Sequence, residues 1–113
     1  MKSKKLRIRC WIEVGGKKFF GPGPAELLQL IESHGSISKA AAKMGMSYKK
    51  AWDIVKNINT HGKEPFVAIQ KGGGHGGGAS LTKTGKLVLA EYERLSGKID
   101  TLIEKNNKIL KWL

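Results

Sequence analysis

Six polar residues recur on one side of the helix predicted over residues 47–60. At ~100° per residue they share one arc. The residues of the opposite arc, which we expect to pack against the core, are Ser47, Tyr48, Ala51, Trp52, Ile54, Val55, Ile58 and Asn59. The six polar residues are Lys49, Lys50, Asp53, Lys56, Asn57 and Thr60. We call their arc the polar face. Lysine ammonium groups pair with phosphates or guanine edges and an asparagine amide pairs with an adenine edge, so the polar face has the chemistry to bind a nucleic acid.

A tight turn at Met44-Gly45-Met46 separates this helix from a shorter one before it. Gly45 can adopt the positive φ that a sharp reversal needs, and the small Ala41 lets the second helix cross close to the first. Ser47 is placed to cap the second helix. This spacing meets the steric requirements of a DNA-binding helix-turn-helix. An ordinary helical hairpin is the alternative, which the three lysines of the polar face disfavour.

The composition indicates the kind of partner. The 113 residues are enough for one domain, and 21 Lys and Arg against 9 Asp and Glu give a net charge of +12. Such a charge attracts a phosphate backbone or an anionic membrane. No apolar run approaches the ~20 residues of a spanning helix, and the basic start lacks a signal-peptide core, so we expect a cytoplasmic protein without membrane contact. The single cysteine, Cys10, is expected to be a small core residue.

We expect an α+β, mainly α fold that starts with a β-hairpin over residues 6–20. Apolar residues alternate with polar ones from Leu6 to Val14, which predicts a half-buried strand, and Gly15-Gly16 predicts a two-residue loop. A three-helix core follows over residues 24–60, with Pro24 in the first helical turn and Gly35 as a left-handed cap.

A second hairpin is predicted over residues 66–82, where strand-like segments flank the glycine-rich run 72–78. Beside a helix-turn-helix such a hairpin is called a wing, and its glycine backbone N–H groups can bind phosphates. The run contains a G-x-G-x-x-G pattern, but no helix follows it at once, so a dinucleotide-binding enzyme is disfavoured. The three histidines and Cys10 have no metal-ligand spacing. We therefore expect no enzyme, cofactor or metal.

A C-terminal helix is predicted over residues 83–113, with a hydrophobic stripe at heptad spacing. Its expected dimerisation residues are Tyr92, Leu95, Ile99, Leu102, Asn106, Ile109 and Leu113. Asn106 is the one polar residue of the stripe, and an amide at such a position favours a two-stranded assembly. The alternative is that the stripe ends at Leu95 or Leu102.

Several motifs together resemble the N-terminal winged-helix domain of the ModE family of molybdate-responsive transcriptional regulators, relatives of the LysR-type DNA-binding domains. The likeness covers roughly residues 6–95. It is carried by Gly35-Ser36-Ile37-Ser38 with Ala40-Ala41, Met46-Ser47-Tyr48-Lys49 followed by Ala51-Trp52-Asp53, Gly76-Gly77-Gly78-Ala79, and Leu81-Thr82 with Gly85. The resemblance implies that the helix from Ser47 is a recognition helix and that a dimer binds a palindromic operator.

The resemblance does not extend to the molybdate-binding domains of that family. We therefore expect a stand-alone DNA-binding protein that does not itself sense molybdate, and a separate sensor protein stays open as a partner.

The function expected is sequence-specific, dimeric binding of double-stranded DNA in transcription regulation. The residues expected to contact DNA are Ser36, Ser38, Ser47, Tyr48, Lys49, Lys50, Asp53, Lys56, Asn57, Thr60, Lys71, His75 and Lys83. Two alternatives stay open. One is a nonspecific or architectural nucleic-acid binder, and the other is a helix-turn-helix that has become a protein-interaction module.

Overall fold

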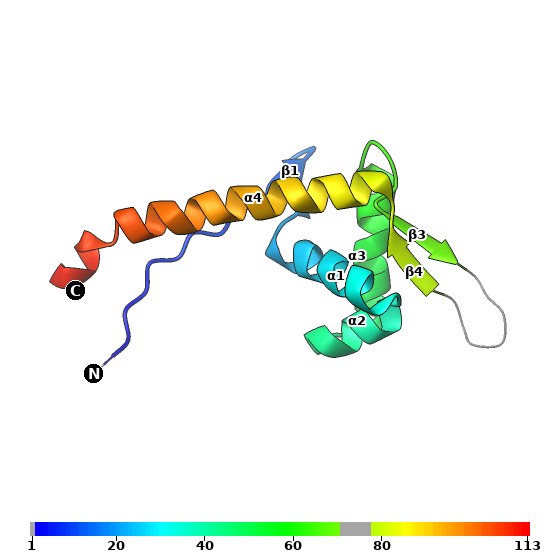
Figure 1. Cartoon of the computed structure of the whole chain (residues 1–113), viewed down its shortest axis with the longest axis horizontal. Coiled ribbons are helices and arrows are strands. Elements are labelled where there is room, and N and C mark those ends of the chain that lie inside the picture. Colours follow the sequence, from blue (N-terminus) through cyan, green and yellow to red (C-terminus); the bar gives the residue numbers. More distant parts are fainter. Residues whose placement is uncertain (1, 71–77) are drawn as a thin grey trace.

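The computed structural model describes residues 2–70 and 78–113 (Figure 1). Within these residues helices dominate, and two small antiparallel sheets complete the fold. The predicted α+β, mainly α, winged-helix-like class is confirmed. In chain order the elements are β1 Ile12–Val14, β2 Lys17–Phe20, α1 Pro22–His34, α2 Ile37–Met44, α3 Tyr48–His61, β3 Val67–Gln70, β4 Gly78–Leu81 and α4 Lys83–Lys105, followed by a 3-10 segment at Lys108–Trp112.

The hydrophobic core lies among α1, α2 and α3, and β2, the second hairpin and the first half of α4 close it. Apolar residues at helical spacing on α1 and α3 supply most of its bulk. The small Ala40, Ala41 and Ala51 are also buried, which lets α2 and α3 approach closely. The largest wholly buried side chains are those of Phe20, Leu27, Leu28, Ile31, Val55 and Ile58.

The turns around α2 have the predicted chemistry. Gly35 and Gly45 both have a φ of +67°, the left-handed conformation that ends a helix at low cost in glycine. Ser47 caps α3, because its Oγ accepts a hydrogen bond from the backbone N–H of Lys50 at 3.0 Å. Helix α1 starts at Pro22 rather than at Pro24, and both prolines lie in its first turn, where a missing N–H costs little.

The N-terminal hairpin is shorter than predicted. Strand β1 begins at Ile12, all three of its residues are exposed, and Cys10 is only half-buried, so the half-buried strand predicted from Leu6 is wrong. Strand β2 has four residues, and therefore offers residues 6–11 no partner for a longer ladder. The predicted loop is correct: Gly15 and Gly16 have φ values of +61° and +80° and connect Val14 to its partner Lys17.

Helix α4 leaves the core and projects beyond it for about half its length (Figure 1). It passes through Gly97 and ends at Lys105, so the predicted helix over 83–113 is too long. Asn106 caps its end instead of continuing it: the side-chain amide donates to the carbonyl of Leu102 at 2.8 Å. An asparagine that bonds to the backbone of its own turn competes with the helix. Asn106, Ile109 and Leu113 are therefore not positions of one continuous heptad stripe.

Tyr92 also differs from its predicted place. Only 7% of it is exposed, its ring packs edge-on against Phe20 at 5.2 Å, and its hydroxyl donates to the carbonyl of Cys10 at 2.7 Å. This residue belongs to the core of its own chain rather than to an exposed dimerisation stripe.

Candidate nucleic-acid interface

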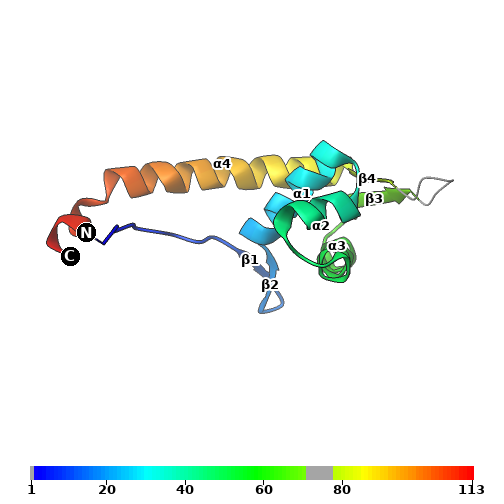
Figure 2. The same cartoon turned by 90° about the horizontal axis from the view of Figure 1, so that it is seen from below.

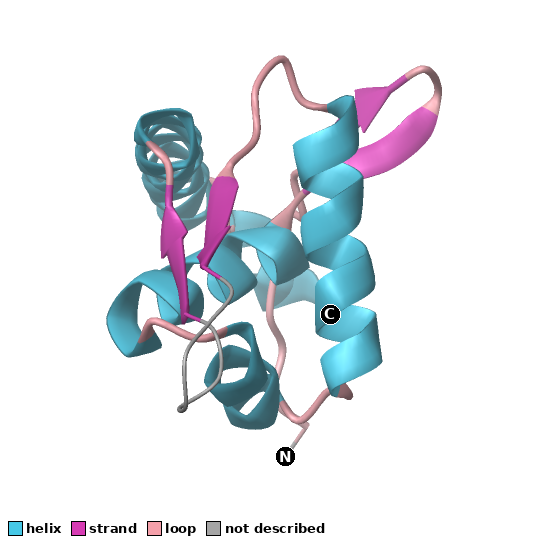
Figure 3. Ribbon diagram, turned by 90° about the vertical axis from the view of Figure 1, so that its right-hand side faces the viewer, coloured by secondary structure: helices cyan, strands magenta, loops and turns pink. Residues whose placement is uncertain are grey.

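Helix α3 lies on the side of the molecule away from α4, together with the β1–β2 hairpin (Figures 2 and 3). Its apolar residues Ala51, Val55 and Ile58 are wholly buried, which fixes the rotation of the helix about its axis. The six residues of the polar face are all exposed. The sequence pattern therefore assigned the polar face of α3 correctly, and the packing arc correctly for Ala51, Val55 and Ile58.

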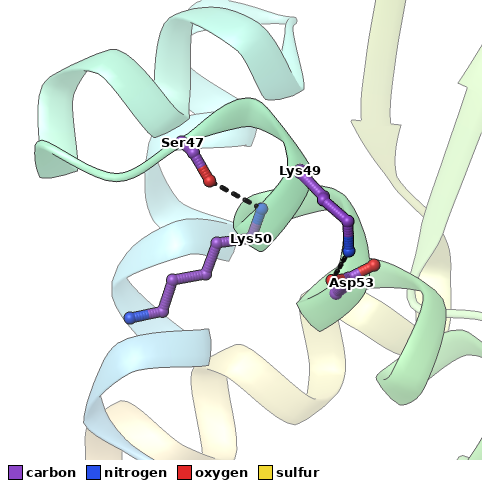
Figure 4. A network of polar contacts seen from close by, with 4 residues as sticks. All are labelled: Ser47, Lys49, Lys50 and Asp53. Atoms are coloured by element: carbon purple, nitrogen blue, oxygen red, sulfur yellow. Dashed lines mark hydrogen bonds and ion pairs between the residues drawn. The ribbon is translucent and has the colours of Figure 1, made fainter.

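Charge on the polar face is partly paired within the helix (Figure 4). Lys49 Nζ lies 3.0 Å from a carboxylate oxygen of Asp53, one turn further on. Because both side chains are more than half exposed, this ion pair contributes little to stability. The side chain of Lys50 extends away from Asp53 (Figure 4). Lys50 is exposed, so its ammonium group can contact a ligand at the surface.

Ser36 and Ser47 serve first as helix caps. The Oγ of Ser36 accepts the backbone N–H of Lys39 at 3.2 Å, as that of Ser47 does for Lys50. Each hydroxyl still has its own hydrogen to donate to a phosphate oxygen. Ser38 is exposed on the first turn of α2.

Of the four other residues expected to contact DNA, two lie within the described residues and two do not. Tyr48 is 58% exposed, although the helical periodicity placed it with the packing arc, and Lys83 is exposed at the start of α4. Trp52 is half-buried against the core, as predicted. Lys71 and His75 lie outside the described residues.

Sequence reasoning missed the role of Asn59. Its Oδ1 accepts the backbone N–H groups of Phe66 at 2.8 Å and Val67 at 3.0 Å, and its Nδ2 donates to the carbonyl of Val67 at 2.9 Å. The side chain thus fixes β3 to the last turns of α3. The available signal was a polar residue within an otherwise apolar arc, which favours a satisfied, structural amide.

Thr82, at the turn between β4 and α4, is hydrogen-bonded to the segment just before β3. Thr82 Oγ1 donates to the carbonyl of Pro65 at 2.7 Å and accepts the N–H of Gly85 at 3.0 Å. The backbone N–H of Thr82 donates to the carbonyl of Phe66 at 2.9 Å. Residues 65–67 therefore join α3, the second hairpin and α4 at one place.

Residues 2–70 and 78–113 contain neither a metal site nor a membrane-spanning helix. No group of three or more His, Cys, Asp or Glu side chains is arranged there to hold a metal ion. None of the helices in this part of the chain combines the length and apolar character needed to cross a bilayer.

Curated relatives match most of the chain, although no protein-family model matches it. The transcriptional regulator ModE of Yersinia pestis is 41% identical over 92 residues, which are 81% of this chain and 35% of that protein. The DNA-binding transcriptional dual regulator ModE of Escherichia coli (strain K12) is 39% identical over 92 residues, with the same two shares. The molybdenum-pterin-binding protein MopA of Rhodobacter capsulatus is 35% identical over 99 residues, 88% of this chain and 37% of that protein.

None of these three names describes an enzyme. The chain spans about a third of the length of the curated relatives it matches. Over most of its own length, the chain is thus related to the ModE and Mop proteins.

Proposed function

We propose that this chain is a sequence-specific DNA-binding transcriptional regulator whose helix α3 lies in the major groove. The observation that carries the proposal is the exposed polar face on the second helix of a helix-turn-helix, with the second hairpin fixed to that helix by Asn59. The relatives named as transcriptional regulators support it.

The polar face offers both kinds of contact that DNA recognition needs. Lys49, Lys50 and Lys56 would bind phosphates or guanine edges, and Asn57 would bind an adenine edge. Ser47 would donate to a backbone oxygen. The net charge of +12 adds a long-range attraction that speeds encounter with DNA but carries no sequence information.

A second copy of the chain is the partner we propose for α4. Leu87, Leu95 and Leu102 are 58%, 43% and 52% exposed, and the first two line an open hollow of about 520 Å³ that Ile12 also borders. Pairing of these surfaces would bury apolar area and give the two-fold symmetry that a palindromic operator requires.

Selection of binding sites from random duplex DNA tests this function. A specific dimeric reader yields a palindrome and prefers it over random DNA by ~10³ or more at physiological salt. A selection without consensus, together with equal affinity for all duplexes, would refute sequence-specific recognition.

The nonspecific or architectural alternative rests on one observation, the net charge of +12. In that case affinity for any duplex would fall steeply with salt and no site would be preferred. Failure to bind any duplex at all would instead favour a protein-interaction module.

A further inference from the structure

The β1–β2 hairpin lies beside α3, on the same side of the molecule and away from α4 (Figures 2 and 3). Along the long axis, α3 lies between this hairpin and the β3–β4 hairpin (Figures 1 and 2). An open hollow of about 310 Å³ separates β2 from α3. Lys18 and Phe19 line it from β2, and Lys50, Ile54 and Asn57 line it from α3.

Two lysines from elements distant in sequence thus border one hollow. The ammonium group of Lys18 lies 4.2 Å from the centre of the Trp11 ring, a cation–π contact that restricts its motion before any ligand binds. Asp53 also lines the hollow, but its carboxylate is paired with Lys49 at 3.0 Å. Glu13 is the cross-strand partner of Lys18, and its carboxylate accepts the indole N–H of Trp11 at 3.4 Å.

Geometry decides which part of DNA would meet this hollow. An α-helix with its side chains is ~10–12 Å wide and fills the major groove, which is ~12 Å wide. When α3 occupies the groove, an element at its flank therefore meets the groove wall, and that wall is a phosphodiester backbone. A hollow with a lysine on either side suits one phosphate.

We propose that the β1–β2 hairpin is a second DNA-contacting element, and that Lys18 and Lys50 bind one backbone phosphate in the hollow between β2 and α3. The inference rests on the proposed function, since it needs α3 in the major groove. It gives the hairpin a binding role that its sequence alone does not suggest.

The test compares Lys18→Gln with Lys17→Gln in the full chain, using the duplex obtained by site selection. Both changes remove one positive charge from an exposed residue of β2, but Lys18 lines the hollow and Lys17 does not. Lys18→Gln should weaken binding at least about fivefold more than Lys17→Gln does and lower the salt slope by ~0.9, with the selected consensus unchanged. Lys18→Arg should restore most of the affinity.

Phosphate ethylation interference supplies a direct readout. Ethylation of one particular phosphate should block binding of the wild-type protein. The same ethylation should not weaken binding of Lys18→Gln further, but it should still block binding of Lys17→Gln. Equal affinities and equal interference patterns for the two variants would overturn the hairpin inference while leaving recognition by α3 intact. If the wild-type protein prefers no duplex, the proposed function fails and the inference fails with it.

Discussion

Asn59 and Val67 are joined by two hydrogen bonds that tie the end of α3 to the first strand of the β3–β4 hairpin. The N–H of Val67 donates to Asn59 Oδ1 at 3.0 Å, and Asn59 Nδ2 donates to the carbonyl of Val67 at 2.9 Å. The side-chain amide of Asn59 thus gives β3 one hydrogen-bond donor and one acceptor, as the backbone of a neighbouring strand would. One side chain therefore sets the position of β3 relative to the polar face.

Replacing Asn59 by Ala should lower the free energy of unfolding by about 1–3 kcal/mol, because the part-buried N–H groups of Phe66 and Val67 lose their acceptor. Urea unfolding measures the loss. Asn57→Ala is the matched control, since Asn57 is exposed on the same helix and its replacement should change stability by no more than about 0.5 kcal/mol. Equal stability of both variants would show that Asn59 does not hold β3.

Two glycines of α4 should respond to alanine in opposite directions. A Cβ at Gly85 would overlap the carbonyl oxygen of Phe66, so Gly85→Ala should destabilise the protein by about 1–3 kcal/mol. A Cβ at Gly97 would meet nothing within 4 Å, so Gly97→Ala should stabilise it by roughly 0.5–1 kcal/mol. Thermal unfolding of both variants checks the signs, and a neutral Gly85→Ala would contradict the close contact between α4 and Phe66.

Tyr92 should make stability fall at alkaline pH. Burial, with a smaller contribution from Cys10, raises the pKa of Tyr92 above its ordinary value of 10.0, and the hydrogen bond with Ser96 opposes this only in part. Above pH 10 the unfolded chain therefore loses the tyrosine proton while the folded chain keeps it, which favours unfolding. The contribution is fully present below pH 10 and is lost as the pH rises through the folded pKa.

Tyr92→Phe isolates this effect, because the two proteins differ only in the hydroxyl group of this residue. At pH 7 the variant should be less stable by about 1 kcal/mol, since the hydrogen bond to Cys10 is lost. The difference should shrink as the pH rises above 10. A constant difference from pH 7 to pH 11 in urea unfolding would argue against a raised pKa.

Local chemistry explains what the sequence could predict. Gly45, Ser47 and the arcs of α3 follow from residue-by-residue rules, because a positive φ, a cap and a 3.6-residue period are each encoded within one or two turns. The length of β1 and the burial of Tyr92 could not be predicted from such local rules. Strand β1 depends on how far β2 reaches, and Tyr92 on a core assembled from β2 and α1.

The end of α4 shows the limit of periodicity in another way. Heptad spacing continues through Asn106, yet α4 ends at Lys105, where the side-chain amide of Asn106 donates to the carbonyl of Leu102. The hollow between β2 and α3 lay beyond sequence reasoning too, since Lys18 and Lys50 are brought together only by the tertiary fold.

Disruption of the proposed α4 dimer should leave the monomer folded. Leu102 is 52% exposed on the projecting half of the helix, so Leu102→Lys should raise the dissociation constant of the dimer at least tenfold without lowering helix content. Thr101→Lys adds the same charge at an exposed neighbouring position and should change dimerisation much less. Sedimentation equilibrium distinguishes them, and equal masses for Leu102→Lys and wild type would place the interface elsewhere.

Binding of the selected duplex by the double variant Lys49→Ala/Lys50→Ala tests the central claim, recognition by the polar face, most directly. The control is Lys4→Ala/Lys5→Ala, which removes the same charge from exposed positions of the N-terminal segment. We expect the first variant to bind at least ~2 kcal/mol more weakly than wild type, with an unchanged thermal midpoint, and the control to lose far less affinity. Equal affinities for both double variants, or an unchanged affinity for Lys49→Ala/Lys50→Ala, would contradict recognition by α3.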